Sequence, residues 1–335
     1  MSKSGADKKS LRLLVSEAAW QRYGEKIREV LPSCQPVLMA AAANGATLDA
    51  DIAWVSRDVT GLSTKHEVQP DTQRFYDAML SAPSLRWAHA HSAGADRPVF
   101  VQLRQRGVTV TTSSGANAAV VAQTALTGLL ALARHFPQMM LAQQNKRWAS
   151  LIETGLPRDL SGQTVMIVGW GPIGKLLGGV LRLLGLHVVA VRQQPSEPCD
   201  GVEMTTFADM SDVLPRTDWL VLACPLTQTT QGLINEQALS LLPHGARIVN
   251  VARGEVVDEV ALIRALESGR LAGAYLDVFA HEPLHGDSPL WSLPNVIVTP
   301  HSAGFSDGNA DRVFEIFLNN LGRWEKGEAL VNQAS

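Results

Sequence analysis

The sequence predicts an α/β protein with two doubly wound domains, each built on a parallel sheet. Short apolar runs typical of buried strands alternate with helical patterns along the whole chain. This alternation favours parallel strands with helices on both faces of the sheet. The chain has 335 residues, which is enough for about two domains of ~150 residues each.

The first part of the chain opens with a predicted strand at 11–15, followed by an amphipathic helix. Apolar side chains recur at helical spacing in that helix, at Trp20, Tyr23, Ile27, Val30 and Leu31. Another helix is expected over 71–81. The other predicted strands of this part are 36–41, 52–56, 85–90 and 108–112.

The pattern changes at 113–115, Ser-Ser-Gly, which we interpret as a hinge. A weakly polar helix is expected over 117–136, stopping near Pro137, and a second helix leads to residues 146–148. The final element, 305–326, again has a helical pattern. Between residue 148 and this final element, a new series of strands is predicted, at 163–168, 187–191, 218–223, 246–251, 271–276 and 295–300.

The composition is that of an ordinary globular protein. Hydrophobic residues make up 46% and charged residues 18%, and the net charge of −3 gives no basic field for nucleic acid or an anionic membrane. Cys34, Cys199 and Cys224 form neither a disulfide framework nor a metal-ligand pattern, so we expect a cytoplasmic protein without a metal. Residues 107–133 carry no charge, but polar residues interrupt them, which favours a buried helix over a membrane span of ~20 apolar residues.

Residues 169–174, Gly-Trp-Gly-Pro-Ile-Gly, follow a predicted strand and open a helix. In such a loop the first glycine permits the tight turn, the second lets the backbone approach a pyrophosphate, and the third allows helix and strand to pack closely. The helix N-terminus then presents N–H groups to the phosphates. The motif therefore predicts a Rossmann dinucleotide site, and a glycine-rich turn without a ligand is the alternative.

Arg192 ends the next predicted strand, where a nicotinamide-cofactor enzyme usually has an acidic residue. An Asp or Glu would bond the ribose hydroxyls and repel a 2′-phosphate, whereas an arginine can pair with that phosphate. Gln193 and Gln194 are neutral and can donate as well. The segment predicts a preference for NADP, with NAD possible. The alternative is a solvated arginine beside a permissive NAD site.

Four polar residues stand just beyond the ends of three predicted strands: Arg253, Asp277, Glu282 and His301. In open α/β sheets, ligands bind beyond the carboxyl ends of the strands. An isolated histidine is most often structural. A cation, two carboxylates and an imidazole at one edge, beside a dinucleotide loop, predict a catalytic site.

The chain resembles the D-isomer-specific 2-hydroxyacid dehydrogenases, and it is nearest in character to the glyoxylate and hydroxypyruvate reductases. This resemblance implies a flavodoxin-like substrate domain of residues 1–112 and 304–335, and a Rossmann domain of residues 113–303. The matching segments are HSAGAD (91–96), SSGANAAVVAQTALTGLLALAR (113–134), the glycine loop, DVLPRTDWLVLACPLTQTTQGLI (212–234), VNVARGEVVDEVALIRAL (249–266), AGAYLDVFAHEPL (272–284) and NVIVTPHSAG (295–304).

The resemblance also implies roles for single residues. Arg253 would bind the substrate carboxylate and polarise the 2-oxo group. His301 would be the general acid for reduction, and Glu282 would orient it. The substrate carboxylate would lie on the loop Ser92, Ala93 and Gly94, with Trp148 of a neighbouring subunit beside the pocket. The expected cofactor contacts are Gly169, Gly171, Pro172, Ile173, Gly174, Arg192, Gln193, Cys224, Pro225, Val251, Ala252, Asp277, His301 and Ala303.

The implied function is the reduction of a small 2-oxo acid, of the glyoxylate or hydroxypyruvate kind, to the D-2-hydroxy acid. Two alternatives stay open: an NAD-dependent dehydrogenase that works oxidatively, and a non-catalytic cofactor-sensing protein of the same fold. We also expect a homodimer built on the uncharged helix 117–134, because so broad an apolar surface is costly in water. His89 and His91 flank the substrate loop. Either they contact the substrate or they have a structural role.

Overall fold

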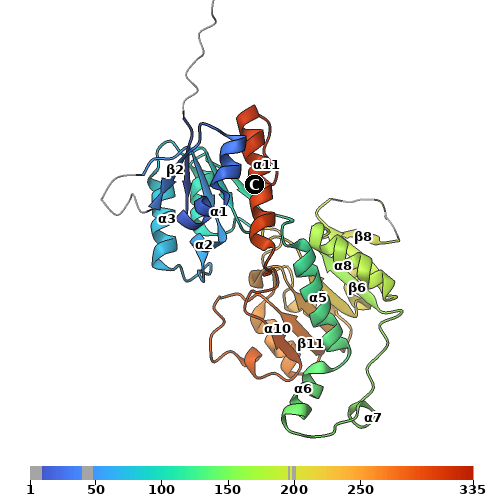
Figure 1. Ribbon diagram of the computed structural model, residues 1–335. Helices are drawn as coiled ribbons and strands as arrows, with labels where there is room; N and C mark the ends of the chain where they lie inside the picture. The colour runs from blue at the N-terminus through green and yellow to red at the C-terminus, as the bar shows by residue number, and fades with distance from the viewer. Residues whose placement is uncertain (1–9, 40–47, 195–196, 198–200, 335) are drawn as a thin grey trace, which may run out of the picture. The chain divides into compact units, whose positions relative to one another are not determined.

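The computed structural model describes residues 10–39, 48–194, 197 and 201–334. Cys199 and the end of the predicted strand 36–41 lie outside the described residues. The chain divides into two compact units (Figure 1). Residues 1–117 together with 306–335 form unit 1, and residues 118–305 form unit 2.

Unit 1 contains a five-stranded parallel sheet of order β2-β1-β3-β4-β5. This is the strand order of flavodoxin-like folds. The strands are β1 Arg12–Val15, β2 Gln35–Leu38, β3 Ile52–Val55, β4 Trp87–Ala90 and β5 Thr109–Thr112. The helices are α1 Glu17–Val30, α2 Arg57–Thr60, α3 Pro70–Ser81, α4 Pro98–Gln105 and α11 Asn309–Lys326.

Helix α11 completes the core of unit 1, although unit 2 separates it in sequence from the rest. The ring of Phe317 stacks on Trp54 of β3 with centroids 4.7 Å apart, and on Trp87 of β4 at 5.5 Å. Phe314 stacks on Tyr23 of α1 at 4.1 Å. Such pairs add specific geometry to the apolar area that they bury. The C-terminal helix is therefore part of the first folding unit.

Unit 2 contains a seven-stranded parallel sheet of order β12-β11-β10-β9-β6-β7-β8. Together the two sheets confirm the predicted fold class. The strands are β6 Thr164–Val168, β7 His187–Arg192, β8 Glu203–Thr206, β9 Trp219–Leu222, β10 Ala246–Asn250, β11 Leu271–Leu276 and β12 Val296–Val298. The helices are α5 Ala118–Ala133, α6 Phe136–Gln144, α7 Leu151–Thr154, α8 Pro172–Leu183, α9 Glu236–Leu241 and α10 Glu259–Glu267.

Helix α5 packs against the sheet of unit 2, which explains why it carries no charge. A Cβ atom at Gly128 would lie 2.3 Å from the ring of Tyr275 in β11, so glycine is required at this close approach. The helix ends at Ala133 rather than near Pro137. Pro137 instead lies in the first turn of α6, where its missing N–H costs no hydrogen bond. The prediction that Pro137 stops the helix was therefore wrong.

In the described part of the chain, no single helix is long and apolar enough to cross a membrane. Helices α5 and α6 meet the length and composition criteria only as a pair, and they are bent by 72° relative to each other.

Candidate active site

The predicted site residues of unit 2 follow the carboxyl ends of its strands. Because the sheet is parallel, these ends share one edge. The strand order reverses between β6 and β9, and in open α/β sheets a ligand crevice forms at such a point. The residues at this edge are Gly169 after β6, Arg192 ending β7, Cys224 after β9, Arg253 after β10, Asp277 after β11 and His301 after β12.

The three glycines of the loop between β6 and α8 have two different roles. Gly169 has a φ of +106°, and a Cβ there would lie 2.7 Å from the backbone of Ala223. A Cβ at Gly174 would lie 2.2 Å from the carbonyl oxygen of Gly169. At Gly171, by contrast, no atom lies within 4 Å of the position of an added Cβ. The first and third glycines are fixed by packing, while the second leaves space at the N-terminus of α8 that suits a pyrophosphate.

Arg192 is the last residue of β7, the strand beside β6. Its side chain is exposed, as is that of Gln193. Its backbone pairs with Thr206 of β8, so the neighbouring edge strand supports it. The cation therefore stands at the strand end where Rossmann domains hold the adenine ribose.

The other predicted cofactor residues are mostly backbone or packing groups. Cys224 is buried, and this burial raises the pKa of its thiol to about 11. The thiol is therefore no nucleophile at neutral pH. Val251 and Ala252 are also buried, whereas Pro225 is exposed.

Arg253 is held by the buried side chain of Asn250. The Asn250 Nδ2 group donates to the carbonyl oxygen of Arg253 over 3.1 Å, and its Oδ1 atom accepts from Ala252 N over 3.0 Å. Arg253 Nη1 donates to the carbonyl oxygen of Ala252 over 2.7 Å. The turn after β10 is thus fixed by its own strand, and the half-buried guanidinium extends from a rigid base.

Asp277 is buried just after β11, and its carboxylate accepts three hydrogen bonds. Oδ1 accepts from the Thr299 hydroxyl over 2.6 Å and from Ser302 N over 2.8 Å, and Oδ2 accepts from Ala303 N over 3.0 Å. Burial raises the pKa of Asp277, and these donors oppose that shift. The carboxylate is therefore tied to the turn that carries His301.

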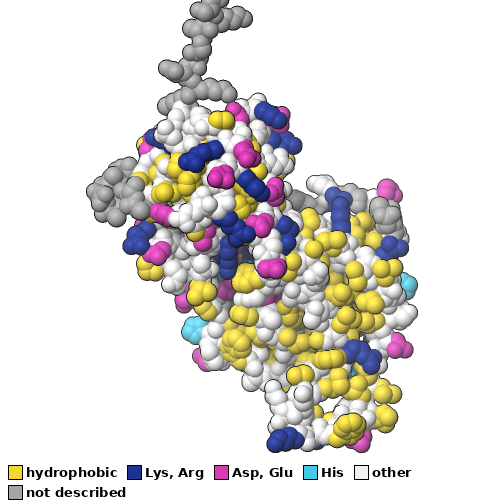
Figure 2. Space-filling model, viewed as in Figure 1, with side chains coloured by type: hydrophobic (Ala, Val, Ile, Leu, Met, Phe, Trp, Pro, Cys, Tyr) yellow, Lys and Arg dark blue, Asp and Glu magenta, His cyan; other side chains and the backbone are white. Residues whose placement is uncertain are grey.

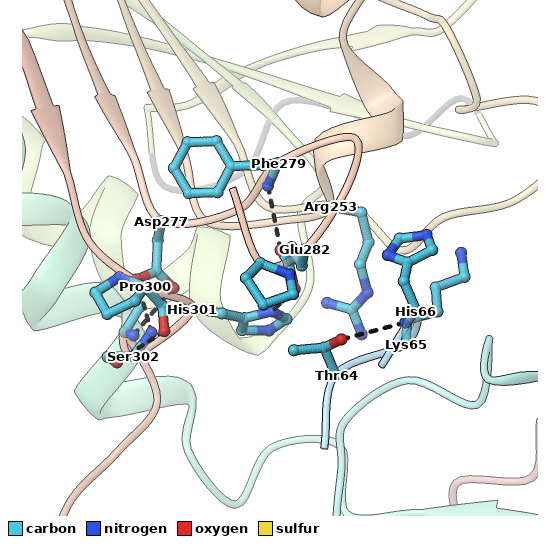
Figure 3. A network of polar contacts seen from close by, with 12 residues as sticks. Thr64, Lys65, His66, Arg253, Asp277, Phe279, Glu282, Pro300, His301 and Ser302 are labelled. Atoms are coloured by element: carbon cyan, nitrogen blue, oxygen red, sulfur yellow. Dashed lines mark hydrogen bonds and ion pairs between the residues drawn. The ribbon is translucent and has the colours of Figure 1, made fainter. Parts of the chain in front are cut away.

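Glu282 and His301 form a hydrogen-bonded pair, with His301 Nδ1 donating to Glu282 Oε2 over 2.7 Å (Figure 3). The Glu282 side chain is only 14% exposed, whereas that of His301 is 48% exposed. Glu282 Oε1 accepts from Phe279 N over 3.1 Å, so both carboxylate oxygens are engaged. With Nδ1 committed to the carboxylate, Nε2 is the ring nitrogen left to exchange a proton with a substrate.

The charge state of Glu282 follows from this environment. Burial alone would raise the pKa of its carboxyl group, but the hydrogen bond and charge of His301, the Phe279 N–H and the charge of Arg253 outweigh it. The net pKa lies below its usual value, so Glu282 is ionised at neutral pH. Figure 3 shows Arg253, Glu282 and His301 on neighbouring loops at this edge of unit 2.

In unit 1 the predicted substrate loop follows β4. The Ser92 hydroxyl donates to the carbonyl oxygen of Gly94 over 2.6 Å, which closes the loop on itself. Ala93 is exposed. The carbonyl oxygen of Ser92 accepts from Ser113 N over 3.0 Å, so the loop is joined to the end of β5.

His89 is fully buried within a polar chain in unit 1. Its Nδ1 lies 2.7 Å from Thr111 Oγ1, and its Nε2 lies 3.0 Å from Ser113 Oγ. Because the single Ser113 hydroxyl proton is donated to the carbonyl oxygen of Ala90, Nε2 must donate to Ser113 and Nδ1 must accept from Thr111. Burial lowers the pKa of His89 to about 3. His89 is thus a neutral structural histidine.

His91 stands beside the substrate loop but is also neutral. Its Nε2 lies 2.8 Å from the Thr60 hydroxyl. Burial, followed by the charges of Arg57 and Arg97, lowers the pKa of His91 to about 3. The ring can offer hydrogen bonds, but it holds no proton for transfer near neutral pH.

Trp148 lies between α6 and α7, and it is 95% exposed. This exposure excludes a core role for the side chain.

Three residues at this edge were absent from the sequence prediction: Asn250, Tyr275 and Thr299. Each supports a neighbouring residue rather than projecting a charge into the site. The one available signal was a buried amide inside the apolar run 246–251, since such a group needs hydrogen-bond partners.

Comparison with known proteins agrees with this geometry. The model of the D-isomer specific 2-hydroxyacid dehydrogenase NAD binding domain matches residues 126–303. A glyoxylate reductase of Thermococcus kodakarensis is 34% identical over 285 residues, covering 83% of this chain and 84% of that protein.

Two solved structures cover almost the whole chain. A D-isomer specific 2-hydroxyacid dehydrogenase of Xanthobacter autotrophicus, in complex with NADPH and MES, has a TM-score of 0.75 and 29% identity, and covers 97% of this chain and 98% of that one. The NADPH-dependent glyoxylate/hydroxypyruvate reductase of Sinorhizobium meliloti, in complex with NADP and sulfate, has a TM-score of 0.77 and 25% identity, with 98% of each chain covered. The chain belongs to the D-isomer specific 2-hydroxyacid dehydrogenases, a family of NAD(P)-dependent oxidoreductases.

Proposed function

We propose that the protein reduces a small 2-oxo acid, of the glyoxylate or hydroxypyruvate kind, to the D-2-hydroxy acid, with NADP(H) as its preferred cofactor. The observation that carries the proposal is the Glu282–His301 pair, 2.7 Å apart, at the sheet edge that also carries the glycine loop. The glyoxylate reductase from Thermococcus kodakarensis supports the substrate class, and the bound NADPH and NADP of the two structural relatives support the cofactor.

Several residues of the chain contribute to the proposed reduction, each in a different role. The bound cofactor supplies the hydride. Arg253 binds the substrate carboxylate and polarises the 2-oxo group, because a cation near the oxygen stabilises the charge that develops there. The backbone N–H groups of Ala93 and Gly94 are proposed to hold the carboxylate as well. His301 donates its proton to the oxygen, and Glu282 accepts from Nδ1 and keeps the ring oriented.

Arg192 is proposed to select NADP(H), with Gln193 as a neutral donor beside it. One charge-assisted hydrogen bond contributes about 1.5–3 kcal/mol, which corresponds to a roughly 10- to 150-fold preference in kcat/KM. Arg192→Asp replaces the attraction to a 2′-phosphate by repulsion and adds an acceptor for the ribose hydroxyls. The preference should shrink sharply or invert, while kcat at saturating cofactor changes little.

The test is a pair of cofactor titrations, with NADPH and NADH, at a fixed concentration of glyoxylate. Arg216→Asp is the matched control, because Arg216 is an exposed arginine of the same unit that precedes β9 and so lies at the opposite edge of the sheet. It makes the same change in charge and should leave the preference intact. Equal kcat/KM values for both cofactors in the wild type would refute the role of Arg192. Tight NADPH binding without turnover of any 2-oxo acid in a panel would instead favour a cofactor-sensing protein.

A homodimer is proposed on the exposed apolar surface of unit 2. Figure 2 shows hydrophobic side chains gathered over α5 and α8, and Leu183 of α8 is 87% exposed. Much of α5 itself is buried within the unit, so the surface to be covered lies on α8 and on the segment 136–156. Apolar patches of this kind mark association surfaces.

Trp148 is proposed to border the substrate pocket of the neighbouring subunit. Trp148→Ala should raise KM for the 2-oxo acid, whereas Trp148→Phe should retain most of the affinity because a large aromatic ring remains. Measurement of the mass in solution tests the dimer independently. A mass equal to the monomer refutes the dimer, and unchanged KM values in a dimeric Trp148→Ala variant refute the pocket role alone.

A further inference from the structure

Three backbone N–H groups of the turn that carries His301 are bound by one buried residue. His301 has a left-handed backbone with φ of +49°, which is uncommon for a residue other than glycine. Its N–H donates to the carbonyl oxygen of Asp277 over 2.8 Å. The next two N–H groups, of Ser302 and Ala303, donate to the carboxylate of the same residue. Three consecutive backbone N–H groups are thus anchored on Asp277, as Figure 3 illustrates for Ser302.

Behind Asp277 lies an ordered chain of two hydroxyl groups. The Thr299 hydroxyl donates to Asp277 Oδ1 over 2.6 Å, and the Tyr275 hydroxyl lies 2.8 Å from Thr299 Oγ1. Because the single hydroxyl proton of Thr299 is committed to Asp277, Tyr275 must be the donor to Thr299. The Tyr275 ring in turn lies against Gly128 of α5, where no larger residue fits.

Helix α5 also reaches the turn directly. The Thr124 hydroxyl lies 3.1 Å from the carbonyl oxygen of Ala303 and 3.0 Å from that of Val120, so its proton is shared between the two. The turn is therefore tied to the sheet through Thr299 and to α5 through Thr124.

The position of this turn decides whether His301 meets its carboxylate. Glu282 is anchored separately, by Phe279 N, on the loop after β11. A shift of the turn would therefore change the 2.7 Å distance between His301 Nδ1 and Glu282 Oε2 rather than carry both groups together. A misplacement of ~1 Å in a catalytic site can cost about 10²-fold in rate.

We propose that Thr299, Tyr275 and Thr124 are positioning residues, which hold the turn so that His301 stays paired with Glu282. The inference rests on the proposed function, because it takes His301 as the proton donor. None of the three needs to touch a substrate: each acts through Asp277 or Ala303.

The principal test compares Thr299→Val with Thr299→Ser in the complete protein. Valine keeps the shape of threonine and removes the hydroxyl, so kcat for glyoxylate reduction should fall roughly 10-fold, the equivalent of one lost hydrogen bond. The KM for glyoxylate should stay within about twofold, since the hydroxyl does not contact this substrate in the proposal. The rates are measured at saturating NADPH, because the turn also carries Ala303, an expected cofactor contact. Thr299→Ser keeps the hydroxyl and should restore kcat to within about threefold of wild type.

Helix α5 offers a matched pair of variants for the second arm. Thr127 makes the same bond to the carbonyl oxygen four residues earlier, at 2.8 Å, but is exposed and has no recorded bond to the turn. Thr124→Val should lower kcat by about threefold, because its proton is shared, whereas Thr127→Val should leave kcat unchanged. The mass of both variants in solution is measured, so that an effect on association is recognised.

A spectroscopic readout separates positioning from general stability. The proton that His301 Nδ1 shares with Glu282 should give a downfield proton NMR signal in the NADP complex, identified by its absence in His301→Gln. Thr299→Val and Thr124→Val should shift or broaden this signal, and Thr127→Val should not. Tyr275→Phe, which keeps the ring against Gly128, replaces Thr299→Val if that variant does not fold.

The outcomes are distinguishable. If His301→Gln retains wild-type activity, the proposed function fails. If His301→Gln is inactive while Thr299→Val and Thr124→Val keep both kcat and the signal, the positioning role is overturned and the proposed function stands. Equal losses in Thr299→Val and Thr299→Ser, with the signal unmoved, would also overturn it, because they would show a purely structural role.

Discussion

Each of the two units has a histidine just after a parallel strand, but the two rings lie in opposite environments. In unit 1, burial and then the charges of Arg57 and Arg97 lower the pKa of His91 to about 3, and its Nε2 lies 2.8 Å from the Thr60 hydroxyl. In unit 2, the side chain of His301 is 48% exposed, and its Nδ1 lies 2.7 Å from the carboxylate of Glu282. The residue type and the position after a strand are alike, and the difference lies in the burial of the ring and in its partner.

This difference shows what makes a histidine useful for acid catalysis. Burial and a cationic neighbourhood favour the uncharged ring, which has no proton to give near neutral pH. An ionised carboxylate that accepts from Nδ1 fixes the orientation of the ring and leaves Nε2 for the substrate. We therefore expect the chemistry of the protein to depend on the histidine of unit 2, and the histidines of unit 1 to act as neutral hydrogen-bonding groups.

The largest effect should come from exchanging these two histidines for glutamine one at a time. His301→Gln removes the proton donor, so kcat for glyoxylate reduction should fall by roughly 10²–10⁴. His91→Gln keeps a hydrogen-bonding group and should change kcat by less than about tenfold, because His91 transfers no proton. Steady-state kinetics on both variants measures this, and an equal loss in the two would break the comparison.

An intermediate effect is expected when the partner of His301 is neutralised. The pKa of Glu282 lies below its usual value, so its carboxylate is charged throughout the neutral range. Glu282→Gln removes the charged acceptor of the His301 Nδ1 proton, so kcat for glyoxylate reduction should fall roughly tenfold, the equivalent of about one charge-assisted hydrogen bond. Steady-state kinetics at pH 7 measures this loss.

The matched control for this change is Glu259→Gln. Glu259 Oε2 accepts from Ala280 N over 2.9 Å, beside the residue that donates to Glu282, but it has no recorded bond to His301. Its kcat should match that of wild type. A Glu282→Gln variant with the kcat of wild type would mean that the pairing has no influence on proton transfer.

The smallest effect concerns stability in acid, and it tests the neutral histidine of unit 1. The pKa of His89 is lowered to about 3 in the folded protein from 6.5, so the unfolded chain binds the proton first as the pH falls. The stability that the neutral His89 contributes is thus complete above pH 6.5 and is lost between 6.5 and about 3. At pH 5 the loss should be about 2 kcal/mol.

Urea unfolding at pH 7 and pH 5 measures this loss in wild type and in His89→Gln. The variant does not titrate at this position, so it should lose about 2 kcal/mol less than wild type between the two pH values. Its stability at pH 7 can differ for other reasons, and the comparison therefore uses only the change with pH. The same loss in both proteins would show that His89 is not held neutral.

The fold could be predicted because its signals are local. Apolar runs marked the buried strands, and the glycine loop marked the turn between β6 and α8. The edge strand β8, Glu203–Thr206, was missed because its residues are half-buried or exposed, and so carry little apolar signal. The end of α5 was misplaced because a proline can open a helix as readily as it ends one.

The place of the charged side chains at the carboxyl edge of the sheet could also be predicted, since each follows a strand. The hydroxyl groups that support these charged side chains could not be predicted. Tyr275 and Thr299 read as ordinary strand residues, and only the parallel pairing of β11 with β12 brings the two hydroxyls together. The burial of His89 and its two hydroxyl partners likewise depends on strands distant in the sequence.

The place of α11 in unit 1 has a consequence for the order in which the protein is made. Unit 2 is continuous, so all of residues 118–305 are translated, and leave the ribosome, before Phe314 and Phe317. Until then the indole of Trp54 lacks the ring that stacks on it at 4.7 Å. Domains fold as units during synthesis, normally the N-terminal one first. Here the middle of the chain reaches completion before its beginning, and the N-terminal sheet must wait, partly uncovered, for the last helix.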